Sequence, residues 1–395
     1  MVQTLYVGID VSKDFSSAQG VDSRGGKIFY LSFQMDSKGF SELLSSITSC
    51  CKDLSKVIIA MESTGCYHLN LYAFLISRGI KTVVINPLLI SNFTKLSLRK
   101  TKTDKKDALS IAQFLLAHKE SLCNLSSSQD LQDLKDLARE RESITVLLSG
   151  IKNDIKRLLQ STFPELEVLC NPFTETMLHF LIKFPSARLI QAASSKRIAK
   201  SLLHSDKRKR VSIHPEEIIS AARGSVASAS AAKEMILPEK ISTLLYLIEQ
   251  QNKMTEMLVK LCESTVVEDL RIITSIHGIG DKTGATFLAE IGNIKNFKSA
   301  KSIIAYAGID PSIHQSGKFE GRSTISKRGN RHLRRVLFMM AKHVSREDTF
   351  FKTYYQKRKG EGLCFKKAVL ATAHKLVRVL FAMLSTRSYF SMQST

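Results

Sequence analysis

The stretch TLYVGIDVSKDFSSAQGVDSRGGKIFYLSFQM, residues 4–35, decides the fold of the N-terminal part of this protein. The segments TLYVGIDV, SSAQGV and KIFYLSFQM each have the composition and the length of a β-strand. The segment DSRGG predicts a turn between the second and third strands, because Gly25 and Gly26 can adopt positive φ at no steric cost. Three strands joined by short connections predict a meander.

The chain then alternates between helical and strand patterns. After the meander comes a helix, with Phe40, Leu43, Leu44 and Ile47 at helical spacing, and then the buried strand KVIIAM, which ends at Glu62. The helix YHLNLYAFLISRG follows and is stopped by Gly79. The strand KTVVIN and a helix opened by Asp104 complete the series. A meander followed by such alternation predicts an α/β domain over residues 1–124, with a mixed sheet and covering helices.

Charge is the unusual bulk property. The chain has 395 residues, enough for two or three domains, and 58 basic against 36 acidic residues give a net charge of +22. Such a balance favours a polyanionic partner, with a membrane surface as the competing interpretation. We find no apolar run near the roughly 20 residues of a spanning helix and no signal-peptide pattern. We therefore expect a cytoplasmic protein without membrane contact.

Residues 125–265 predict long amphipathic helices. Apolar residues recur three and four apart in two stretches, Leu131–Leu158 and Ile241–Leu261, as in a coiled coil. Two such helices on either side of a polar, less regular middle predict either an antiparallel pair or a dimer seam, and packing within a bundle is the commoner use.

Residues 266–395 predict a mostly α-helical C-terminal domain. It opens with LRIITSIHGIGDKTGATFLAEIG, in which Gly278 and Gly280 predict a tight turn between two short helices. A helix-hairpin-helix of this kind can present backbone N–H groups to a phosphate, although glycine pairs between helices are equally common for structural reasons.

A basic block follows at residues 316–335, SGKFEGRSTISKRGNRHLRR. Its cations are Lys318, Arg322, Lys327, Arg328, Arg331, Arg334 and Arg335, against the single acid Glu320. A charge run is often just a solvated face, but small residues between the cations favour phosphate docking.

Four acids form a second pattern. Asp10 and Glu62 end two predicted strands, and Asp104 and Asp107 open a helix whose apolar stripe includes Ala108, Ile111, Ala112 and Leu115. Residues three and four apart share a helix face, so both aspartates extend the buried stripe, whereas Lys102, Lys105 and Lys106 are expected to face outward towards nucleic acid.

Carboxylates brought together in this way repel one another unless a cation lies between them. The seven cysteines are scattered and lack the paired spacing of a zinc site, and all-oxygen ligands suit Mg²⁺, or Mn²⁺ in its place. Each acid alone also has an ordinary structural explanation, such as a helix cap or a surface position. The set of four predicts a metal site.

These motifs lead to a family resemblance. YVGIDVSKD, MESTGCYH and KTDKKDA resemble the three acidic boxes of the DEDD-type transposases of bacterial insertion sequences, and GIGDKTG, AYAGIDPS and the basic block resemble that family's C-terminal domain. The resemblance implies a ribonuclease H-like N-terminal domain, similar to Holliday-junction resolvases, in which Asp10, Glu62, Asp104 and Asp107 bind Mg²⁺.

The resemblance also implies a serine that attacks a DNA phosphate. The family's Ser-Ser-Gly-Gly-like stretch corresponds here to HQSGKFEGR, which places Ser316 at the nucleophile and leaves Ser312 and Ser323 as weaker candidates. The resemblance further implies a structured guide RNA that pairs with donor and target DNA, and dimers or tetramers with composite active sites. We expect the same partners here, in a bacterial cytoplasm and on the nucleoid when DNA is bound.

Other classes stay open at this stage. A Holliday-junction-type endonuclease would use the four acids by hydrolysis, and a non-catalytic nucleic-acid-binding protein would need only the glycine turn and the basic block. VGIDVSKD also resembles a phosphate loop of actin-like ATPases, but the second such loop is not evident. A tyrosine recombinase is suggested by His332 and Arg335, with Tyr354 or Tyr355 downstream.

Overall fold

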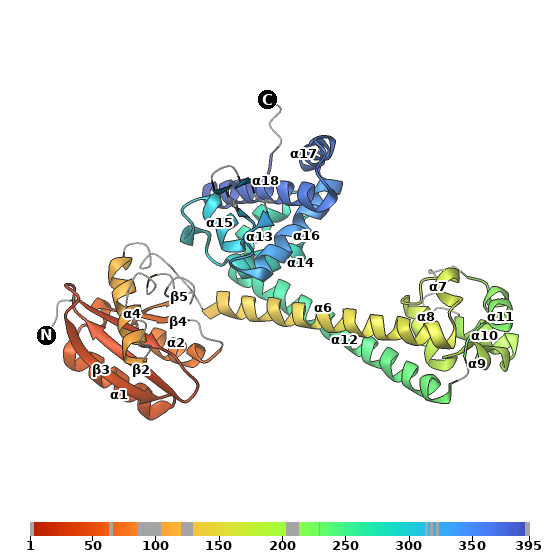
Figure 1. Ribbon diagram of the computed structural model, residues 1–395, viewed down its shortest axis with the longest axis horizontal. Coiled ribbons are helices and arrows are strands. Elements are labelled where there is room, and N and C mark those ends of the chain that lie inside the picture. Colours follow the sequence, from red (N-terminus) through yellow and green to blue (C-terminus); the bar gives the residue numbers. More distant parts are fainter. Residues whose placement is uncertain are drawn as a thin grey trace. The chain divides into compact units, whose positions relative to one another are not determined.

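The protein folds into two compact units, residues 1–129 and residues 130–395, and each is described by itself (Figure 1). The computed structural model describes residues 4–62, 66–85, 90, 93, 104–119, 129–202, 213–228, 230–312, 315–316, 319–320 and 324–391.

The first unit is built on a five-stranded mixed sheet. Its strands are β1 (Leu5–Asp10), β2 (Phe15–Val21), β3 (Lys27–Gln34), β4 (Val57–Glu62) and β5 (Lys81–Ile85). They lie in the order β3-β2-β1-β4-β5. The pairs β1–β2 and β2–β3 are antiparallel, and the pairs β1–β4 and β4–β5 are parallel. The predicted meander and mixed sheet are both confirmed.

Helices cover both faces of this sheet. On one face α1 (Ser37–Cys50) and α2 (His68–Ser77) form a core with the odd-numbered residues of β1, Leu5, Val7 and Ile9. On the other face α4 (Asp104–Ala117) packs with Tyr6. A short 3₁₀ helix, Leu54–Lys56, precedes β4. The face of each strand residue therefore follows from its parity, which fixes the direction of the acids discussed below.

The turn before β3 agrees with its prediction in part. Gly25 has φ of +84°, whereas Gly26 is not among the glycines with positive φ. The carboxylate of Asp22 accepts hydrogen bonds from the N–H groups of Arg24 and Gly26, both at 2.8 Å. An aspartate that ties the turn in this way makes a second positive φ unnecessary.

The second unit contains two long helices, α6 (Gln129–Thr162) and α12 (Ala231–Thr265). They run antiparallel, because hydrogen bonds join Lys240 to Asp154, Gln251 to Thr145 and Arg141 to Thr255 in opposite sequence order. Of the two arrangements left open by the periodicity, the structure has the antiparallel pair within one chain.

The segment between the long helices is helical, as expected for residues 125–265, but where the sequence predicts a polar, less regular middle it has short helices with a core of their own. It forms α7 (Leu166–Leu169), α8 (Glu175–Lys183), α9 (Ala187–Gln191), α10 (Ser195–Leu202) and α11 (Pro215–Arg223). These helices and the adjoining ends of α6 and α12 bury a separate core that includes Phe163, Phe180 and Leu237. Helices of four to nine residues present too few turns for a clear periodic signal.

The C-terminal part packs at the other end of the long pair (Figure 1). Its helices are α13 (Val267–Thr274), α14 (Asp281–Ile291), α15 (Ala300–Ala307), α16 (Arg331–Glu347), α17 (Thr349–Gly360) and α18 (Phe365–Thr386), with a 3₁₀ helix at Ile294–Asn296. Leu134 of α6 and Leu258 of α12 belong to the same core as Leu333 of α16 and Leu376 of α18. The long pair thus shares one core with the C-terminal helices.

Helix α18 corrects the expectation that no segment of the sequence is long and apolar enough to span a membrane. Its 22 residues are long and apolar enough to cross a membrane, by length and composition, and within the described residues it is the one helix that meets this test. Half of its most apolar window is buried inside the protein, and Leu376, Val377 and Leu380 lie in the core. A buried core helix explains this composition without a bilayer.

Candidate active site and nucleic-acid interface

Asp10 and Glu62 end two neighbouring parallel strands. In the register of β1 and β4, Ile9 lies beside Met61, so the two acids follow at adjacent strand ends. Val7, Ile9 and Met61 contact the α1–α2 side of the sheet. Because side chains alternate along a strand, Asp10 and Glu62 both point to the opposite side, where α4 packs.

Gly8 brings α4 against this side of the sheet. A β-carbon at Gly8 would lie 2.3 Å from the carbonyl oxygen of Ala108 and from the amide nitrogen of Ala112, so only glycine permits this approach. On the same helix, Asp107 directly precedes Ala108 and is half-buried, whereas Asp104 lies one turn before Ala108 and is exposed. All four predicted acids therefore belong to the α4 side of the sheet.

The donor chemistry of these acids fits a hard divalent ion. Carboxylate oxygens are the ligands that Mg²⁺ and Mn²⁺ prefer, and two of the four come from rigid strand ends. Within the described parts of the chain, no three Asp, Glu, His or Cys side chains already converge on a common metal position. Residues 63–65, 86–89 and 94–103, which flank these acids in sequence, lie outside those parts.

Of the lysines around the aspartates, Lys105 is exposed and also contacts the sheet. The ammonium group of Lys105 lies 4.9 Å from the centre of the Tyr30 ring on β3. The Tyr30 hydroxyl is 3.2 Å from the Ser17 hydroxyl, and Ser17 pairs with Asp10 across β1 and β2. Attraction between a cation and the face of an aromatic ring explains the position of Lys105.

Lys105 and Lys106 are thus both exposed as expected, and Lys102 lies outside the described residues. Sequence reasoning missed Tyr30 and Ser17. Strand parity could have found Tyr30, because it alternates with the partly buried Phe29 and Leu31 of the α1–α2 core.

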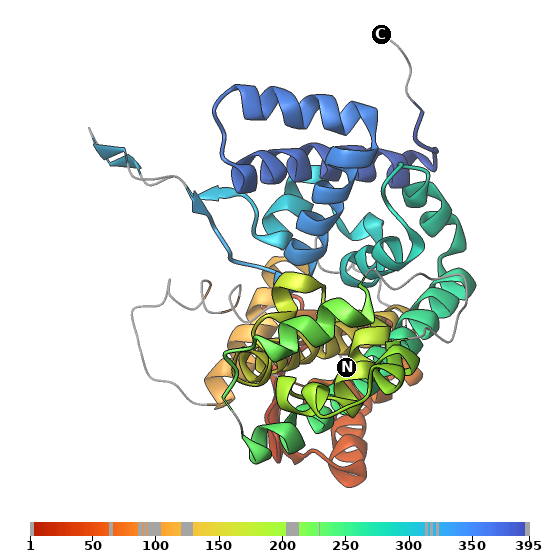
Figure 2. The same ribbon diagram turned by 90° about the vertical axis from the view of Figure 1, so that its right-hand side faces the viewer.

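Ser316 lies in an arm that leaves the C-terminal helices, here defined as β6 (Pro311–Ser312), β7 (Gln315–Ser316), β8 (Phe319–Glu320) and β9 (Thr324–Ile325). The strand β6 pairs with β9, and β7 pairs with β8, so one ladder is nested inside the other (Figure 2). Ser316 pairs with Phe319 in the inner ladder, and Ser312 pairs with Thr324 in the outer one. The predicted residues Lys318, Arg322 and Ser323 lie outside the described residues.

The rest of the basic block is braced against the segment AYAGIDPS. The N–H of Lys327 donates to the carbonyl of Gly308 at 3.0 Å, and the N–H of Asn330 donates to that of Tyr306 at 2.7 Å. A β-carbon at Gly329 would lie 2.3 Å from the Tyr306 carbonyl oxygen, so the contact requires glycine. Two motifs that are separate in the sequence are therefore one structural feature.

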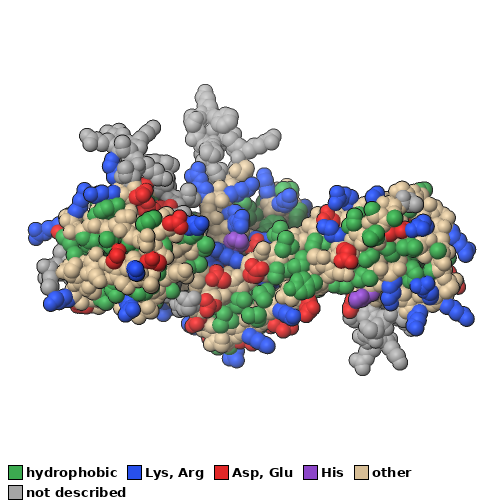
Figure 3. All heavy atoms as spheres, turned by 90° about the horizontal axis from the view of Figure 1, so that it is seen from below, with side chains coloured by type: hydrophobic (Ala, Val, Ile, Leu, Met, Phe, Trp, Pro, Cys, Tyr) green, Lys and Arg blue, Asp and Glu red, His purple; other side chains and the backbone are tan. Residues whose placement is uncertain are grey.

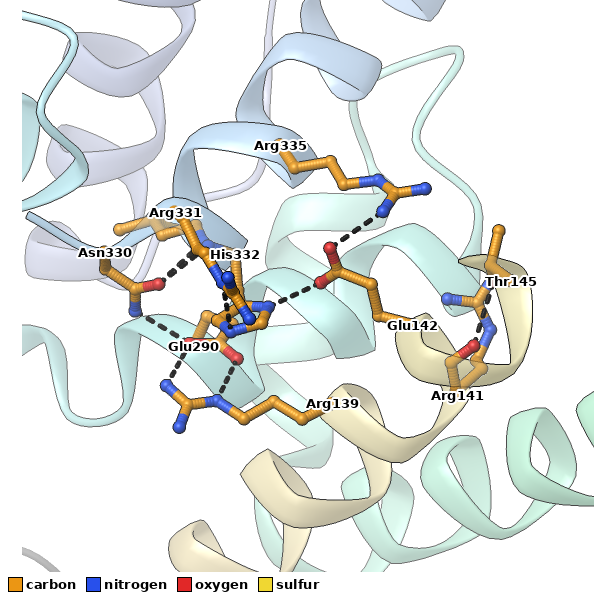
Figure 4. Close-up of polar contacts among 10 residues, drawn as sticks. Arg139, Arg141, Glu142, Thr145, Glu290, Asn330, Arg331, His332 and Arg335 are labelled. Carbon is orange, nitrogen blue, oxygen red and sulfur yellow. Dashed lines mark hydrogen bonds and ion pairs between the residues drawn. The ribbon is translucent and has the colours of Figure 1, made fainter. Parts of the chain in front are cut away.

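A buried carboxylate fixes the start of α16 (Figure 4). Glu290 on α14, whose side chain is 1% exposed, accepts hydrogen bonds from Arg139 on α6 at 3.0 and 3.3 Å. It also accepts one from the Asn330 amide at 2.7 Å, while the Asn330 carbonyl caps α16 by accepting from the N–H groups of His332 and Leu333. Sequence reasoning missed this network, although an asparagine before RHLRR is a typical helix cap.

A second carboxylate, Glu142 on α6, holds two residues of the same turn. It is 2.7 Å from a ring nitrogen of His332 and 2.8 Å from a guanidinium nitrogen of Arg335. Burial tends to raise the pKa of Glu142, but the hydrogen bonds from His332 and Arg335 outweigh it and lower the pKa from its usual value. Glu142 is therefore a charged partner of this turn.

These contacts divide the predicted phosphate-binding cations into two groups. Arg334 donates to the Ala307 carbonyl and Arg335 to Glu142, so both have a structural role. Lys327, Arg328 and Arg331 are exposed, and Arg335 is exposed too despite its contact with Glu142. On the face of the molecule in Figure 3, basic side chains are interspersed with acidic ones over both units, so the net charge of +22 is not one uniform patch there.

The two glycines of the turn differ in their surroundings: Gly278 is packed against α16, and Gly280 is exposed. Gly278 has φ of +94°, and a β-carbon there would lie 3.3 Å from Cα of Val344 on α16, so it is needed for packing. Gly280 caps α14, is exposed, and has no atom near the place of a β-carbon. Of the two, Gly280 has the geometry that a phosphate contact would need.

The residues of a tyrosine recombinase are found in different clusters. His332 and Arg335 contact Glu142, whereas the Tyr354 hydroxyl accepts a hydrogen bond from Arg358 and its ring lies 4.5 Å from the ammonium of Lys375. Tyr355 packs against a small apolar cluster between α16 and α18. These contacts give no support to a His-Arg-Tyr site.

Comparisons with known proteins match this chain in two regions. A model of DEDD transposases of the IS110 type matches residues 7–164, and a model described as the transposase IS116/IS110/IS902 family matches residues 270–356. The first match includes all four acids, and the second includes the arm and the start of α16. Similarity to these families thus covers both parts of the chain in which candidate site residues lie.

Full-length relatives give the same picture. An insertion element IS110 protein of Streptomyces coelicolor is 22% identical, over 98% of this chain and 95% of its own length. A transposase for insertion sequence element IS1111A of Coxiella burnetii is 24% identical, over 97% of this chain and 90% of its own length. A pilin gene-inverting protein of Moraxella bovis is 24% identical, over 96% of this chain and 95% of its own length.

The mixed sheet with its acids and the braced basic segment, together with these matches, define the class: the chain is a transposase, an enzyme that cleaves and recombines DNA. More narrowly, it belongs to the IS110/IS116 family of insertion-element transposases. The DEDD domain of that family implies a ribonuclease H-like fold for the N-terminal unit.

Proposed function

We propose that this transposase cleaves DNA with a serine nucleophile, assisted by Mg²⁺ bound to Asp10, Glu62, Asp104 and Asp107. The observation that carries the metal assignment is the common direction of Asp10 and Glu62, at adjacent ends of β1 and β4 on the side covered by α4. Mg²⁺, or Mn²⁺ in its place, would polarise the scissile phosphate and stabilise the oxygens that enter and leave.

The serine reaction is a transesterification. The hydroxyl of Ser316 gives up its proton, its oxygen forms a bond to phosphorus, and the bond from phosphorus to one deoxyribose oxygen breaks. The released strand end takes up a proton as a free hydroxyl, so a phosphodiester is exchanged for a phosphoserine diester. The proposal therefore needs the acids of residues 1–129 and a serine of residues 130–395 at one phosphodiester, supplied by one subunit or by two.

Its proposed partners are donor DNA, target DNA and a structured guide RNA. The net charge of +22 supports a large polyanionic load, and contacts to phosphates would make binding strongly dependent on salt. We propose that the helix-hairpin-helix around Gly280 and the exposed cations Lys327, Arg328 and Arg331 contact phosphates. We also propose that the protein works as a homodimer or homotetramer in the bacterial cytoplasm, on the nucleoid.

Trapping the covalent intermediate tests this proposal. The protein, with its element DNA and RNA transcript, should give a protein–DNA adduct that resists denaturant, with phosphoserine at residue 316. Ser316→Ala should abolish the adduct and cleavage, while Ser312→Ala and Ser323→Ala should retain both. An adduct on tyrosine, or on one of the other two serines, would refute the assignment of Ser316.

The alternative, a junction endonuclease acting by hydrolysis, is favoured by one observation: all four acids belong to the first unit. It predicts that Ser316→Ala still cleaves DNA without forming an adduct. Under our proposal, cleavage and adduct disappear together.

A further inference from the structure

A pocket of about 270 Å³ adjoins the arm. Ile325 of β9 lines it together with the first turns of α16 and with α18. Its apolar wall includes Ile309, Ile325, Phe338, Met339 and Leu370, and Arg331, Arg334 and Arg335 line the rest. No part of the mechanism above uses this pocket.

The lining combines an apolar floor with cations of fixed position. The guanidinium of Arg334 is anchored on the Ala307 carbonyl and that of Arg335 on Glu142. A guanidinium has five N–H donors, and each of these contacts uses one of them, so donors remain for phosphate oxygens. An apolar floor beside fixed guanidinium groups is complementary to a nucleotide, which joins a flat ring to an anion.

The volume of the pocket also limits the size of the ligand that it can hold. Pockets for small molecules usually range from about 300 to 1,000 Å³, and this one falls just below that range. It is large enough to admit a single base. Enzymes that act on DNA commonly hold an unpaired base between apolar side chains in such a pocket.

We propose that this pocket holds one unpaired base of the DNA substrate, with the adjacent phosphates on Arg331 and Arg334. The inference rests on the proposed function, because Ile309 and Ile325 flank the two ends of the arm that carries Ser316. A base held there would fix the strand next to the attacked phosphodiester. For the same reason the occupant is DNA rather than the guide RNA.

The affinities of the protein for two DNA duplexes that differ at one position test this inference without any cleavage. The full-length Ser316→Ala protein is titrated with a labelled DNA duplex that has one unpaired adenine, and with the same duplex carrying an abasic residue at that position. Stacking on side chains should make binding of the unpaired adenine about tenfold tighter. Phe338→Ala should reduce this preference to within about twofold and leave affinity for the abasic duplex unchanged.

Two arginines of α16 provide a matched pair. Arg331→Ala should weaken binding of both duplexes equally, because it removes a phosphate contact, whereas Arg346→Ala, exposed on the last turn of the same helix, should change neither. If Phe338→Ala does not fold, Met339→Ala replaces it, because Met339 lines the pocket and is 39% exposed.

Crosslinking locates the base directly. A 4-thiothymidine at the unpaired position should crosslink to the peptide that contains Phe338 and Met339. Equal affinity for the two duplexes, a preference that survives Phe338→Ala, a preference shown only by the equivalent RNA duplex, or crosslinks only elsewhere would each overturn the inference. None of these outcomes bears on the covalent adduct, so the proposed function is judged separately.

Discussion

The acid site and the basic segment are built in different ways. Asp10 and Glu62 take their direction from strand parity, and Asp104 and Asp107 from helix periodicity, so regular secondary structure positions all four. The turn from Lys327 to Arg335 is held instead by contacts between distant parts of the chain, with Glu142 and Glu290 as anchors. Substitutions at the two places should therefore have different effects. A substitution in the acid site should abolish DNA cleavage, whereas one in the basic segment should disturb its folded structure.

Removing an acid should have the largest effect. Asp10→Asn and Asp104→Ala should each lower DNA cleavage by at least about a hundredfold, because a ligand to the proposed ion is lost. Binding of nucleic acid, measured by anisotropy, should stay within about twofold. Asp14→Asn, at an exposed position four residues beyond Asp10, is the matched control and should cleave normally. Cleavage that persists in Asp104→Ala would rule out the four-acid site.

Gly8→Ala tests the approach of α4 to the sheet. The added β-carbon would lie 2.3 Å from backbone atoms that cannot move independently, and we expect a loss of about 3 kcal/mol in the free energy of unfolding, together with lost cleavage. Gly150→Ala in α6 has open space around it and should instead gain about 0.5–1 kcal/mol. Chemical denaturation of both variants gives the comparison, and equal stabilities would contradict the close approach.

Glu290→Ala should disturb order in the basic segment rather than chemistry. It leaves Arg139 and Asn330 without their buried acceptor, and we expect a cost of about 2 kcal/mol, reduced because Arg139 is 41% exposed. Hydrogen exchange should quicken at the start of α16 and leave the amides of β1 unchanged. Unchanged exchange at α16 would show that Glu290 does not hold this turn.

Glu142 should give the smallest effect, visible as a dependence on pH. Its pKa is lower in the folded protein than in the unfolded chain, so its contribution is fully present above the unfolded pKa near 4.5 and is lost as pH falls through the folded pKa. The difference in unfolding free energy between the wild type and Glu142→Gln should be below about 1 kcal/mol at pH 7 and should shrink below pH 4.5. A difference that grows on acidification would contradict the lowered pKa.

Prediction from sequence succeeded where the physical rule is local. Every strand and helix predicted before residue 118 is present in the described residues, because strand alternation, glycine turns and helix periodicity act over a few positions. The shared direction of Asp10 and Glu62 needed only the pairing of β1 with β4. The metal assignment and Ser316 remain predictions.

Prediction failed where tertiary contacts decide. The contact of the Lys105 ammonium with the ring of Tyr30, a residue 75 positions earlier in the chain, could not be predicted from the helix pattern around Lys105. Arg334 and Arg335 resemble the other cations of the basic block in sequence, yet their partners are a helix-end carbonyl and an acid of α6. The core formed by α7–α11 was missed because no single short helix carries enough of its apolar pattern.

The antiparallel pair of α6 and α12 also sets the distance between two hydrophobic cores. A helix of 34 residues spans about 50 Å, and one hydrophobic core lies at each end of the pair. Taking seven residues from the middle of each helix would bring the two cores about 10 Å closer, with a small change in their relative rotation. The length of this pair therefore sets the reach of the protein between its two helical ends, independently of the sequence at either one.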